Sequence, residues 1–576
     1  MTRFLGLLPG RADWAAVRRS PKRDLLAGLT VAVVALPLAL AFGVTSGLGA
    51  EAGLVTAVVA GAVAAIFGGS NLQVSGPTGA MTVVLVPVVH QFGAAGVLMV
   101  GAMAGMLLIA LAFARLGRYV RYLPTPVIEG FTAGIAVVIA LQQVPAALGV
   151  TDAHGEKVWA VAADAVARFV ADPRPAALAV ALGVAALMLL GARCRPGLPF
   201  SLIGVAAATL VAELVPVDLV RIGALPQGLP APSLGFLDLG ALGVLLPSAL
   251  AVAALAALES LLSATVADGM TVGERHDPDR ELFGQGLANL AAPVFGGIPA
   301  TAAIARTAVN VRAGAASKLA ALTHAVALAF IVLAAAPLVG RIPLAALAGV
   351  LLATTVRMVE AGSLRALLRA TRADAVVLVL TFAVTVVWDL VTAVVAGLAV
   401  AVVLALRAVA RSARLEQVPL DPGEHSAEEH ALLAEHIVAY RLDGPLFFAA
   451  AHNFLLQLAE VADVRVVILR MSRVSTIDAT GAQVLGDAID RLRGRGIVVL
   501  VSGITPGHDQ VLSALGVADR LRREGLVFAD TPAAIGYARA VALGHLPAPD
   551  PARQEGAPAL PETLRRGPSF HSGTRR

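Results

Sequence analysis

Long apolar stretches separated by short polar loops dominate the first 414 residues of the chain. A helix needs about 20 apolar residues to cross a bilayer, and grouping the stretches at that length predicts about fourteen membrane segments. The pattern therefore predicts an all-α polytopic membrane domain. We place the segments near residues 25–47, 52–68, 76–91, 94–114, 125–148, 176–192, 198–215, 240–267, 282–297, 299–312, 317–338, 342–358, 373–390 and 391–411.

Two of these segments are interrupted by small residues together with Pro and Thr. The first break runs from Ser75 to Thr82 and the second from Gly296 to Thr307. Each break leaves a short helix that begins near the middle of the membrane, where its first N–H groups lack helical partners. These groups and the positive end of the helix dipole attract an anion. The alternative is that Pro77 and Pro299 only kink ordinary helices.

The two breaks occupy matching positions in the two halves of the pattern. The first lies in the third segment and the second in the tenth, which is the third segment of the second half. Because each half has an odd number of segments, the halves have opposite orientations in the membrane. Such a 7+7 inverted repeat brings two half-helices together at the midplane, an arrangement typical of transporter sites.

Basic residues gather in the loops that follow even-numbered segments, and loops of this kind mark the cytoplasmic side. The pattern therefore predicts a multi-pass protein of the plasma or inner membrane with both termini in the cytoplasm. Residues 1–23 precede an apolar run too long for a signal peptide, so we expect them to form a cytoplasmic tail. The basic loop residues are Arg115, Arg118, Arg121, Arg193, Arg195, Arg275, Arg280, Arg312, Lys318, Arg357, Arg365, Arg369 and Arg372.

Composition agrees with a chain that lies mostly in lipid. Hydrophobic residues make up 58% of the 576 residues and charged residues 14%, which is too apolar for a soluble protein of this length. The formal net charge of +5 resides in loops and tails, so membrane topology explains it better than nucleic-acid binding does. The single cysteine, Cys194, excludes an internal disulfide framework.

The character of the chain changes after Arg414. Residues 415–436 form an acidic linker, and the alternating patterns of residues 437–543 predict a small α/β domain with an open sheet. Residues 544–576 lack periodicity, which indicates a disordered tail. We expect strands at Ile437–Leu442, Val464–Met471 and Ile497–Ser502, and helices at Ala451–Val461, Ala479–Arg493 and Asp509–Leu515.

Several stretches between Asp24 and about Leu543 carry a resemblance to a known family. They include DLLAGLTVAVVALPLALAFGVTSGLGAEAGL, QVSGPTGAMT, ALESLLSATVADGMT, GGIPATAAIARTAVNVRAG and TVVWDLVTAVVAGLAVAV. Together these resemble the SulP sulfate permease family of anion transporters, relatives of prestin. The later stretches RLDGPLFFAAAHNF and VVILRMSRVSTIDATGAQVLGDAIDRL resemble the STAS domain of the same family.

The resemblance implies a transporter rather than an enzyme. It implies a 7+7 inverted repeat divided into a mobile core and a gate, elevator-like alternating access and, for many members, a homodimer. It also implies an anion held between the N-termini of the third and tenth segments and lined by the first and eighth. Sulfate is the first candidate for that anion, with bicarbonate and dicarboxylates as alternatives.

The two breaks supply the candidate anion site. Thr78 and Thr301 offer hydroxyls beside free N–H groups, although such hydroxyls often bond to their own helix backbone. Arg306 needs a partner or an aqueous cavity at this depth; the resemblance implies that it adds positive charge to the site, and the alternative is an ion pair with Glu259. The resemblance also implies that Phe42 walls the site. The candidate substrate-binding residues are Phe42, Gly76, Thr78, Gly79, Ala80, Thr301, Ala302, Ala305 and Arg306.

Glu259 lies among apolar residues in the eighth segment and is the candidate for coupling transport to a cation. Burial disfavours the charged form of a carboxyl group, so Glu259 could exchange a proton while the anion crosses. Alternatively, Glu259, Ser263 and Thr301 could offer three oxygen ligands to a sodium ion, because Ser263 lies one helical turn further along. We prefer the proton, because a single buried carboxylate can carry it.

Asp478 and Thr480 follow a predicted strand and open a predicted helix in the tail domain. We interpret them as helix-start residues, although related regulatory domains can be phosphorylated at the position of Thr480. The sequence shows no His or Cys pattern with metal-ligand spacing and no Gly-rich phosphate loop with a Lys, so we expect no metal, no other cofactor and no ATP-driven pump. An anion channel or a membrane-anchored sensor is the alternative from another class.

Overall fold

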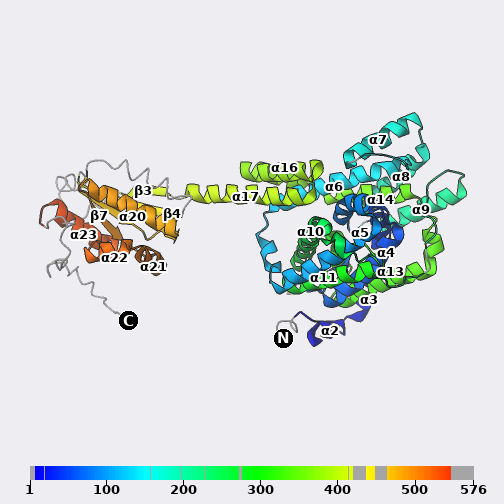
Figure 1. The fold of residues 1–576 in the computed structure, drawn as a ribbon, viewed down its shortest axis with the longest axis horizontal. Helices are drawn as coiled ribbons and strands as arrows, with labels where there is room; N and C mark the ends of the chain where they lie inside the picture. The colour runs from blue at the N-terminus through cyan, green and yellow to red at the C-terminus, as the bar shows by residue number, and fades with distance from the viewer. Residues whose placement is uncertain are drawn as a thin grey trace. The chain divides into compact units, whose positions relative to one another are not determined.

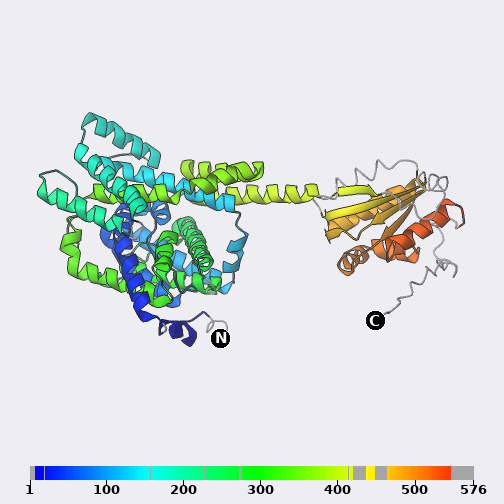
Figure 2. The same ribbon diagram turned by 180° about the vertical axis from the view of Figure 1, so that it is seen from behind.

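The computed structural model describes residues 7–18, 20–155, 157–195, 198–225, 228–271, 275–412, 414–418, 436–447 and 464–545. The chain divides into two compact units, Met1–Ala401 and Val402–Arg576. The first unit is built from helices and the second contains a sheet with helices against it (Figures 1 and 2).

Each predicted membrane segment corresponds to a helix or to one arm of a helix. Within the described residues, nine helices are long and apolar enough to cross a membrane. The prediction of a predominantly helical membrane domain is therefore confirmed. The helices that contain the predicted segments are α3 (Pro21–Thr45), α4 (Ala50–Phe67), α5 (Gly79–Phe113), α6 (Thr125–Leu148), α8 (Pro175–Cys194), α9 (Phe200–Leu214), α10 (Leu242–Gly269), α11 (Pro278–Val294), α12 (Ile304–Arg312), α13 (Lys318–Val339), α14 (Leu344–Met358), α16 (Arg372–Val387) and α17 (Leu390–Ser412).

Helix α5 contains both the third and the fourth predicted segments. Gly93 interrupts it with a φ of 67°, in the left-handed region that glycine adopts more readily than other residues. The interruption falls between the two predicted ranges, 76–91 and 94–114. The structure thus places two consecutive membrane segments in a single kinked element.

Three further α-helices of the first unit were not predicted: α2 (Arg11–Val17), α7 (Val158–Ala171) and α15 (Ala361–Ala370). All three are too short to cross a bilayer, and a search for apolar stretches passes over them. Helix α2 is tied to α11 by Asp13, whose carboxylate oxygens accept hydrogen bonds of 2.9 and 2.8 Å from Arg280. Partial burial raises the pKa of Asp13, but the hydrogen bonds from Arg280 and from the N–H of Gly10 outweigh it, so the pKa lies below its usual value.

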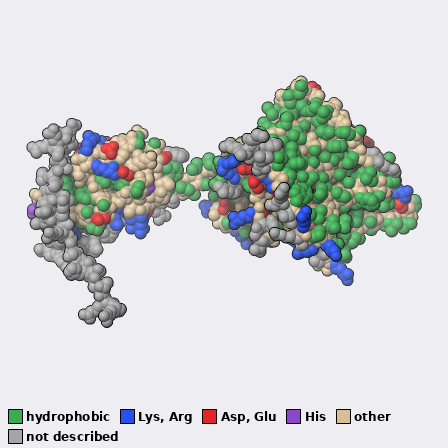
Figure 3. All heavy atoms as spheres, turned by 90° about the horizontal axis from the view of Figure 1, so that it is seen from below, with side chains coloured by type: hydrophobic (Ala, Val, Ile, Leu, Met, Phe, Trp, Pro, Cys, Tyr) green, Lys and Arg blue, Asp and Glu red, His purple; other side chains and the backbone are tan. Residues whose placement is uncertain are grey.

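Apolar side chains cover much of the surface of the first unit. Figure 3 shows a broad, nearly continuous hydrophobic area on this unit. Large side chains such as Leu182, Leu190 and Phe330 are more than half exposed. A surface of this extent is unfavourable in water and suits contact with lipid.

The two breaks pair with each other through the shortest sheet in the molecule. Strand β1 (Ser75–Gly76) runs antiparallel to β2 (Thr301–Ala302), with Ser75 opposite Ala302 and Gly76 opposite Thr301. Helices α5 and α12 begin shortly after these strands, so Pro77 and Pro299 lie outside the helices. The alternative that these prolines only kink continuous helices is therefore wrong. The 7+7 inverted repeat stays a prediction.

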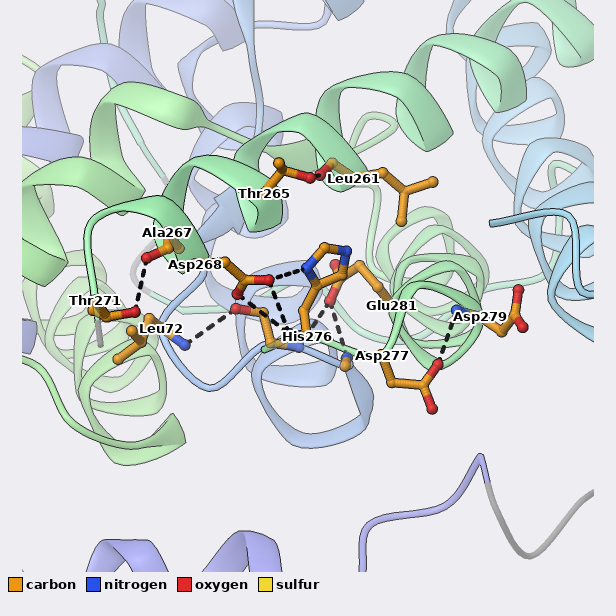
Figure 4. A network of polar contacts seen from close by, with 12 residues as sticks. Leu72, Leu261, Thr265, Ala267, Asp268, Thr271, His276, Asp277, Asp279 and Glu281 are labelled. Carbon is orange, nitrogen blue, oxygen red and sulfur yellow. Dashed lines mark hydrogen bonds and ion pairs between the residues drawn. The ribbon is translucent and has the colours of Figure 1, made fainter. Parts of the chain in front are cut away.

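A polar network joins the ends of α10 and α11. Figure 4 shows Asp268 and His276 side by side, and the Oδ2 of Asp268 lies 2.8 Å from the Nδ1 of His276. Glu281, also in this view, accepts hydrogen bonds from the N–H groups of Gly69 and Ser70. These contacts tie the chain that leads into β1 to the start of α11.

The second unit is a small α/β domain, as predicted. Its strands are β3 (Arg414–Val418), β4 (Ile437–Leu446), β5 (Val466–Arg470), β6 (Val474–Ile477), β7 (Val498–Ser502) and β8 (Val527–Phe528). The sheet order is β3-β4-β5-β7-β8, with β6 also paired to β4; only the β3–β4 pair is antiparallel. Its helices are α20 (Ala479–Gly494), α21 (Pro506–Ala514), α22 (Val517–Arg523) and α23 (Thr531–Ala542).

One predicted boundary of this domain is wrong. The range 415–436 was predicted to be a linker, but residues 414–418 form the edge strand β3. The acidic composition was misleading because Glu416 is an exposed edge-strand residue that forms an ion pair with Arg441 of β4. The rest of the predicted linker, residues 419–435, the predicted helix Ala451–Val461 and residues 546–576 of the predicted tail lie outside the described residues.

Close packing of α3 on α4 predicts opposite effects for two Gly→Ala substitutions. A Cβ at Gly53 would lie 2.0 Å from the carbonyl oxygen of Ala39, whereas a Cβ at Gly183 in α8 would meet nothing within 4 Å. Gly53→Ala should lower the free energy of unfolding by about 1–3 kcal/mol or more, because the helices must separate. Gly183→Ala should be neutral or slightly stabilising. Thermal unfolding in detergent measures both, and equal effects would refute this account.

Candidate binding site between the paired breaks

The starts of α5 and α12 lie close to the short β1–β2 pair and carry no side-chain caps. Thr78 is the N-cap residue of α5 and Ala303 that of α12, and neither makes a side-chain hydrogen bond to its helix. The first N–H groups of each helix have no partner within the helix itself. The N-termini of α5 and α12, with N–H groups that have no partner within their helices, therefore both follow the β1–β2 pair.

Buried amide side chains form hydrogen bonds with the backbone just before β2 and with Ser75 of β1. The side chain of Asn289 accepts a hydrogen bond from the N–H of Ala300 and donates one to its carbonyl oxygen, both at 2.8 Å. Gln285, one turn earlier in α11, donates to the Oγ of Ser75 at 2.6 Å. The sequence analysis did not identify these residues, although polar residues spaced by four in an apolar segment were the available signal.

The hydroxyl of Thr78 is used by a neighbouring helix. Its Oγ1 donates a hydrogen bond of 2.9 Å to the Oε2 of Glu259, which lies half-buried in α10. Thr301, which is fully buried, contacts the Oγ of Ser260 at 3.0 Å and donates to the carbonyl oxygen of Ala256 at 3.1 Å. Neither threonine bonds to its own helix backbone, so that alternative is wrong.

Arg306 is 2% exposed and connects the two breaks directly. Its Nη2 donates a hydrogen bond of 2.6 Å to the carbonyl oxygen of Pro77, just before α5 begins. Its Nη1 has no partner among the described residues and lies close to Gly76, where a Cβ would approach it to 2.6 Å. Arg306 and Glu259 interact electrostatically, but among the described residues they form no direct ion pair, and the hydrogen bond of the guanidinium goes to Pro77 instead.

The three oxygens considered for sodium are not bonded to one another. Glu259 accepts from Thr78, Thr301 contacts Ser260, and Ser263 donates to the Oγ1 of Thr307 at 2.9 Å. Ser260, rather than Ser263, is the residue of α10 next to Thr301. Within the described residues, no group of three or more His, Cys, Asp or Glu side chains could hold a metal ion.

Large apolar side chains cover the start of α5. A Cβ at Gly79 would lie 2.2 Å from the Cδ1 of Ile139 and 3.1 Å from the Cε1 of Phe42, so a larger residue there would have to displace the end of the Ile139 side chain. Phe42 thus reaches the predicted position, whereas Ile139 of α6 was not identified, because an isoleucine in an apolar segment gives no signal. Of the predicted alanines, Ala80 and Ala302 are buried and Ala305 is exposed.

A cavity of about 1530 Å³ lies among helices from the N-terminal and the C-terminal half of the first unit. It is lined by residues of α3, α5, α6, α10 and α14, and by α7 and the ends of α16 and α17. Gln143 donates to Thr45 across this region, while the amide of Gln142 lines the cavity with no partner among the described residues. The cavity is lined by both apolar and polar residues.

The predicted regulatory residues lie at the start of α20. Asp478 caps this helix by accepting a hydrogen bond of 2.7 Å from the N–H of Gly481. Thr480 is exposed in the first turn. The geometry at Asp478 is that of the helix-start residue inferred from the sequence.

Comparison with protein families matches both units. The model of the sulfate permease family matches residues 22–381, and that of the STAS domain matches residues 431–533. YvdB of Bacillus subtilis, provisionally assigned as a sulfate transporter, is 35% identical over 514 residues, which are 87% of this chain and 95% of YvdB. The bicarbonate transporter BicA of Picosynechococcus sp. is 31% identical over 504 residues, or 82% of this chain and 87% of BicA.

Solved structures agree with the fold described above. The transmembrane domain of a cyanobacterial bicarbonate transporter BicA superposes with a TM-score of 0.60 and 33% identity, covering 67% of this chain and 98% of that domain. The structure of SLC26A9 has a TM-score of 0.80 over 94% of both chains. Its identity of 18% supports the fold alone. Together they confirm a helical membrane domain followed by a STAS-type α/β domain.

The contact between Gly76 and Arg306 predicts a local stability effect. Gly76→Ala should displace the guanidinium from Pro77 and lower the free energy of unfolding by about 3 kcal/mol, because a buried charge loses its acceptor. Gly296→Ala is the control, because Gly296 also has a positive φ, of 78°, but a Cβ there meets nothing within 4 Å. It should cost about 1 kcal/mol. Thermal unfolding of both variants measures the difference, and equal losses would rule out the contact as the cause.

Proposed function

The chain belongs to the sulfate permease family, and from this premise we propose that it is a secondary active transporter that moves a small anion across the membrane together with a proton. Sulfate is the first candidate substrate, because YvdB is provisionally assigned as a sulfate transporter. Bicarbonate is the second, because two BicA proteins are 31% and 32% identical to this chain. The observation that carries the proposal is the pair of uncapped helix starts beside Glu259.

The anion is proposed to bind between the starts of α5 and α12. Free N–H groups at both starts offer hydrogen bonds, and both helix dipoles place partial positive charge there. Arg306 adds a full positive charge, although Nη2 is already engaged by Pro77. Arg306 therefore contributes chiefly by its electrostatic potential and by fixing the chain before α5, rather than by holding the anion with both nitrogens.

Thr78 provides a physical link between the anion and the coupling ion. While Glu259 is ionised, its carboxylate holds the Thr78 hydroxyl as a charge-assisted donor. When a proton neutralises Glu259, this hydrogen bond weakens and the hydroxyl can turn toward an anion at the start of α5. Each ligand then favours binding of the other, as reciprocal linkage requires. A sodium ion at the same carboxylate would have the same consequence.

Alternating access is proposed to involve an elevator-like movement of the helices that carry the breaks. The cavity supports this reading, because α3, α5 and α10 form one part of its lining while α6 and α14 form another. Sliding of one group past the other would expose the site to opposite sides of the membrane. A homodimer in the plasma or inner membrane, with both termini in the cytoplasm, completes the proposal.

Uptake into proteoliposomes tests the coupling. An inward proton gradient should concentrate radiolabelled sulfate or bicarbonate, and Glu259→Gln should reduce this accumulation at least tenfold, because the amide cannot carry the proton. Glu129→Gln is the matched control, since Glu129 is also half-buried but bonds to Ser363 away from the breaks. Accumulation that is driven by a sodium gradient alone would show that sodium, and not the proton, is the coupling ion. If neither gradient concentrates an anion, including a dicarboxylate, a channel or sensor becomes the better reading.

The link through Thr78 predicts a separate effect on anion affinity. Thr78→Val keeps the shape but removes the donor, so the KM for the anion should rise about tenfold, in line with the loss of a hydrogen bond to a charged group. Thr78→Ser should restore most of the affinity. Thr209→Val is the control, because Thr209 bonds only to the backbone of its own helix, α9. An unchanged KM in Thr78→Val would remove this residue from the mechanism.

A further inference from the structure

Helix α15 carries a positively charged face that the proposed transport mechanism does not use. The helix has ten residues, AGSLRALLRA, and none of them is fully buried. It connects α14 to α16, both of which correspond to membrane segments. Ten residues cannot cross a bilayer on their own, and a short helix without buried residues suits a position along the membrane surface.

Contacts with two membrane helices fix the rotation of α15. It lies against α16 and α6, and the Oγ of Ser363 donates a hydrogen bond of 2.9 Å to Glu129 of α6. Leu364 and Leu367 are half-buried on the same side. The opposite side of the helix is therefore held away from the protein.

The outward side presents arginines. Arg365 and Arg369 are one helical turn apart and both are exposed, and neither forms an ion pair within the described residues. Leu368, next to Arg369, is 46% exposed. Arg357 at the end of α14 and Arg372 at the start of α16 are also exposed. Cationic and apolar side chains thus alternate on one exposed surface.

Nearby acidic groups do not neutralise this surface. Glu129 accepts the hydrogen bond from Ser363, and Asp374 accepts one of 2.8 Å from Thr371. Glu360 precedes the helix and is exposed. The guanidinium groups of Arg365 and Arg369 are therefore available for an external anion.

We propose that α15 binds the headgroup phosphates of anionic phospholipids in the cytoplasmic leaflet. The guanidinium fork matches the geometry of a phosphate group, and Leu368 can enter the boundary between headgroups and acyl chains. The loop is also one of the basic loops that the positive-inside rule assigns to the cytoplasm. A phospholipid presents phosphate and hydrocarbon together at this depth, which a soluble protein or nucleic acid does not.

Such binding would fix the position of two helices that line the cavity. Helix α6 is bonded to α15 through Glu129, and α16 follows α15 directly. Both contribute residues to the cavity, among them Gln142 and Thr385. Anionic lipid would thereby hold one wall of the cavity at a constant depth in the bilayer.

The test is lipid binding by the full chain, independent of transport. Native mass spectrometry of the purified protein, titrated with phosphatidylglycerol against phosphatidylcholine, measures the preference for the anionic headgroup. The double variant R365Q/R369Q should weaken the binding of phosphatidylglycerol on the order of thirtyfold, about fivefold for each arginine near an anionic surface. The control R491Q/R523Q removes two exposed arginines from α20 and α22 of the second unit and should change it less than threefold.

Several outcomes would overturn the proposal. One is an equal affinity of the unaltered protein for phosphatidylglycerol and phosphatidylcholine. Another is an equal loss of phosphatidylglycerol binding in both double variants. The third is that inorganic phosphate or RNA competes for the site as effectively as the lipid does. If the double variant does not fold, Arg369→Gln alone should show a loss of about fivefold. R365K/R369K should retain much of the binding, since it keeps the charge but loses the planar fork.

Discussion

A backbone that leaves the helical conformation inside a membrane must find hydrogen-bond partners within the protein, because lipid offers none. This requirement governs the centre of the first unit. The two breaks satisfy it partly by pairing with each other as β1 and β2, and further backbone groups are taken by Asn289 and Arg306. The first N–H groups of α5 and α12 have no partner within their own helices, so the constraint that stabilises the breaks also leaves the donors at which we propose that an anion binds.

The fold was largely predictable because lipid imposes a simple pattern on sequence. Each predicted segment corresponds to a helix or helix arm, and the two breaks were located from Gly, Pro and Thr inside apolar runs. Elements shorter than a membrane span were missed, as α7 and α15 show. The edge strand β3 was mistaken for a linker, because a solvent-exposed strand residue such as Glu416 has the same polarity as a loop residue.

The contacts of the site were less predictable than its location. Thr78 and Glu259 were both singled out, but their hydrogen bond joins residues 181 positions apart, and no local pattern encodes it. Ile139 and Ser260 were missed because isoleucine and serine are ordinary in membrane helices. The role of Arg306 also depends on tertiary structure, since a carbonyl oxygen, which every residue carries, takes the place expected for a carboxylate.

The pairing of β1 with β2 has a consequence for the energetics of the proposed transport cycle. Because the two half-helices are joined through their own backbones and through Arg306, they are expected to shift as one piece. An anion bound between them would keep the same donors whichever face of the bilayer is open. Its intrinsic affinity would then be nearly symmetric, and the sign of net flux would follow from the electrochemical potentials on the two sides. Under the proposed mechanism, transport would therefore run equally well in either direction.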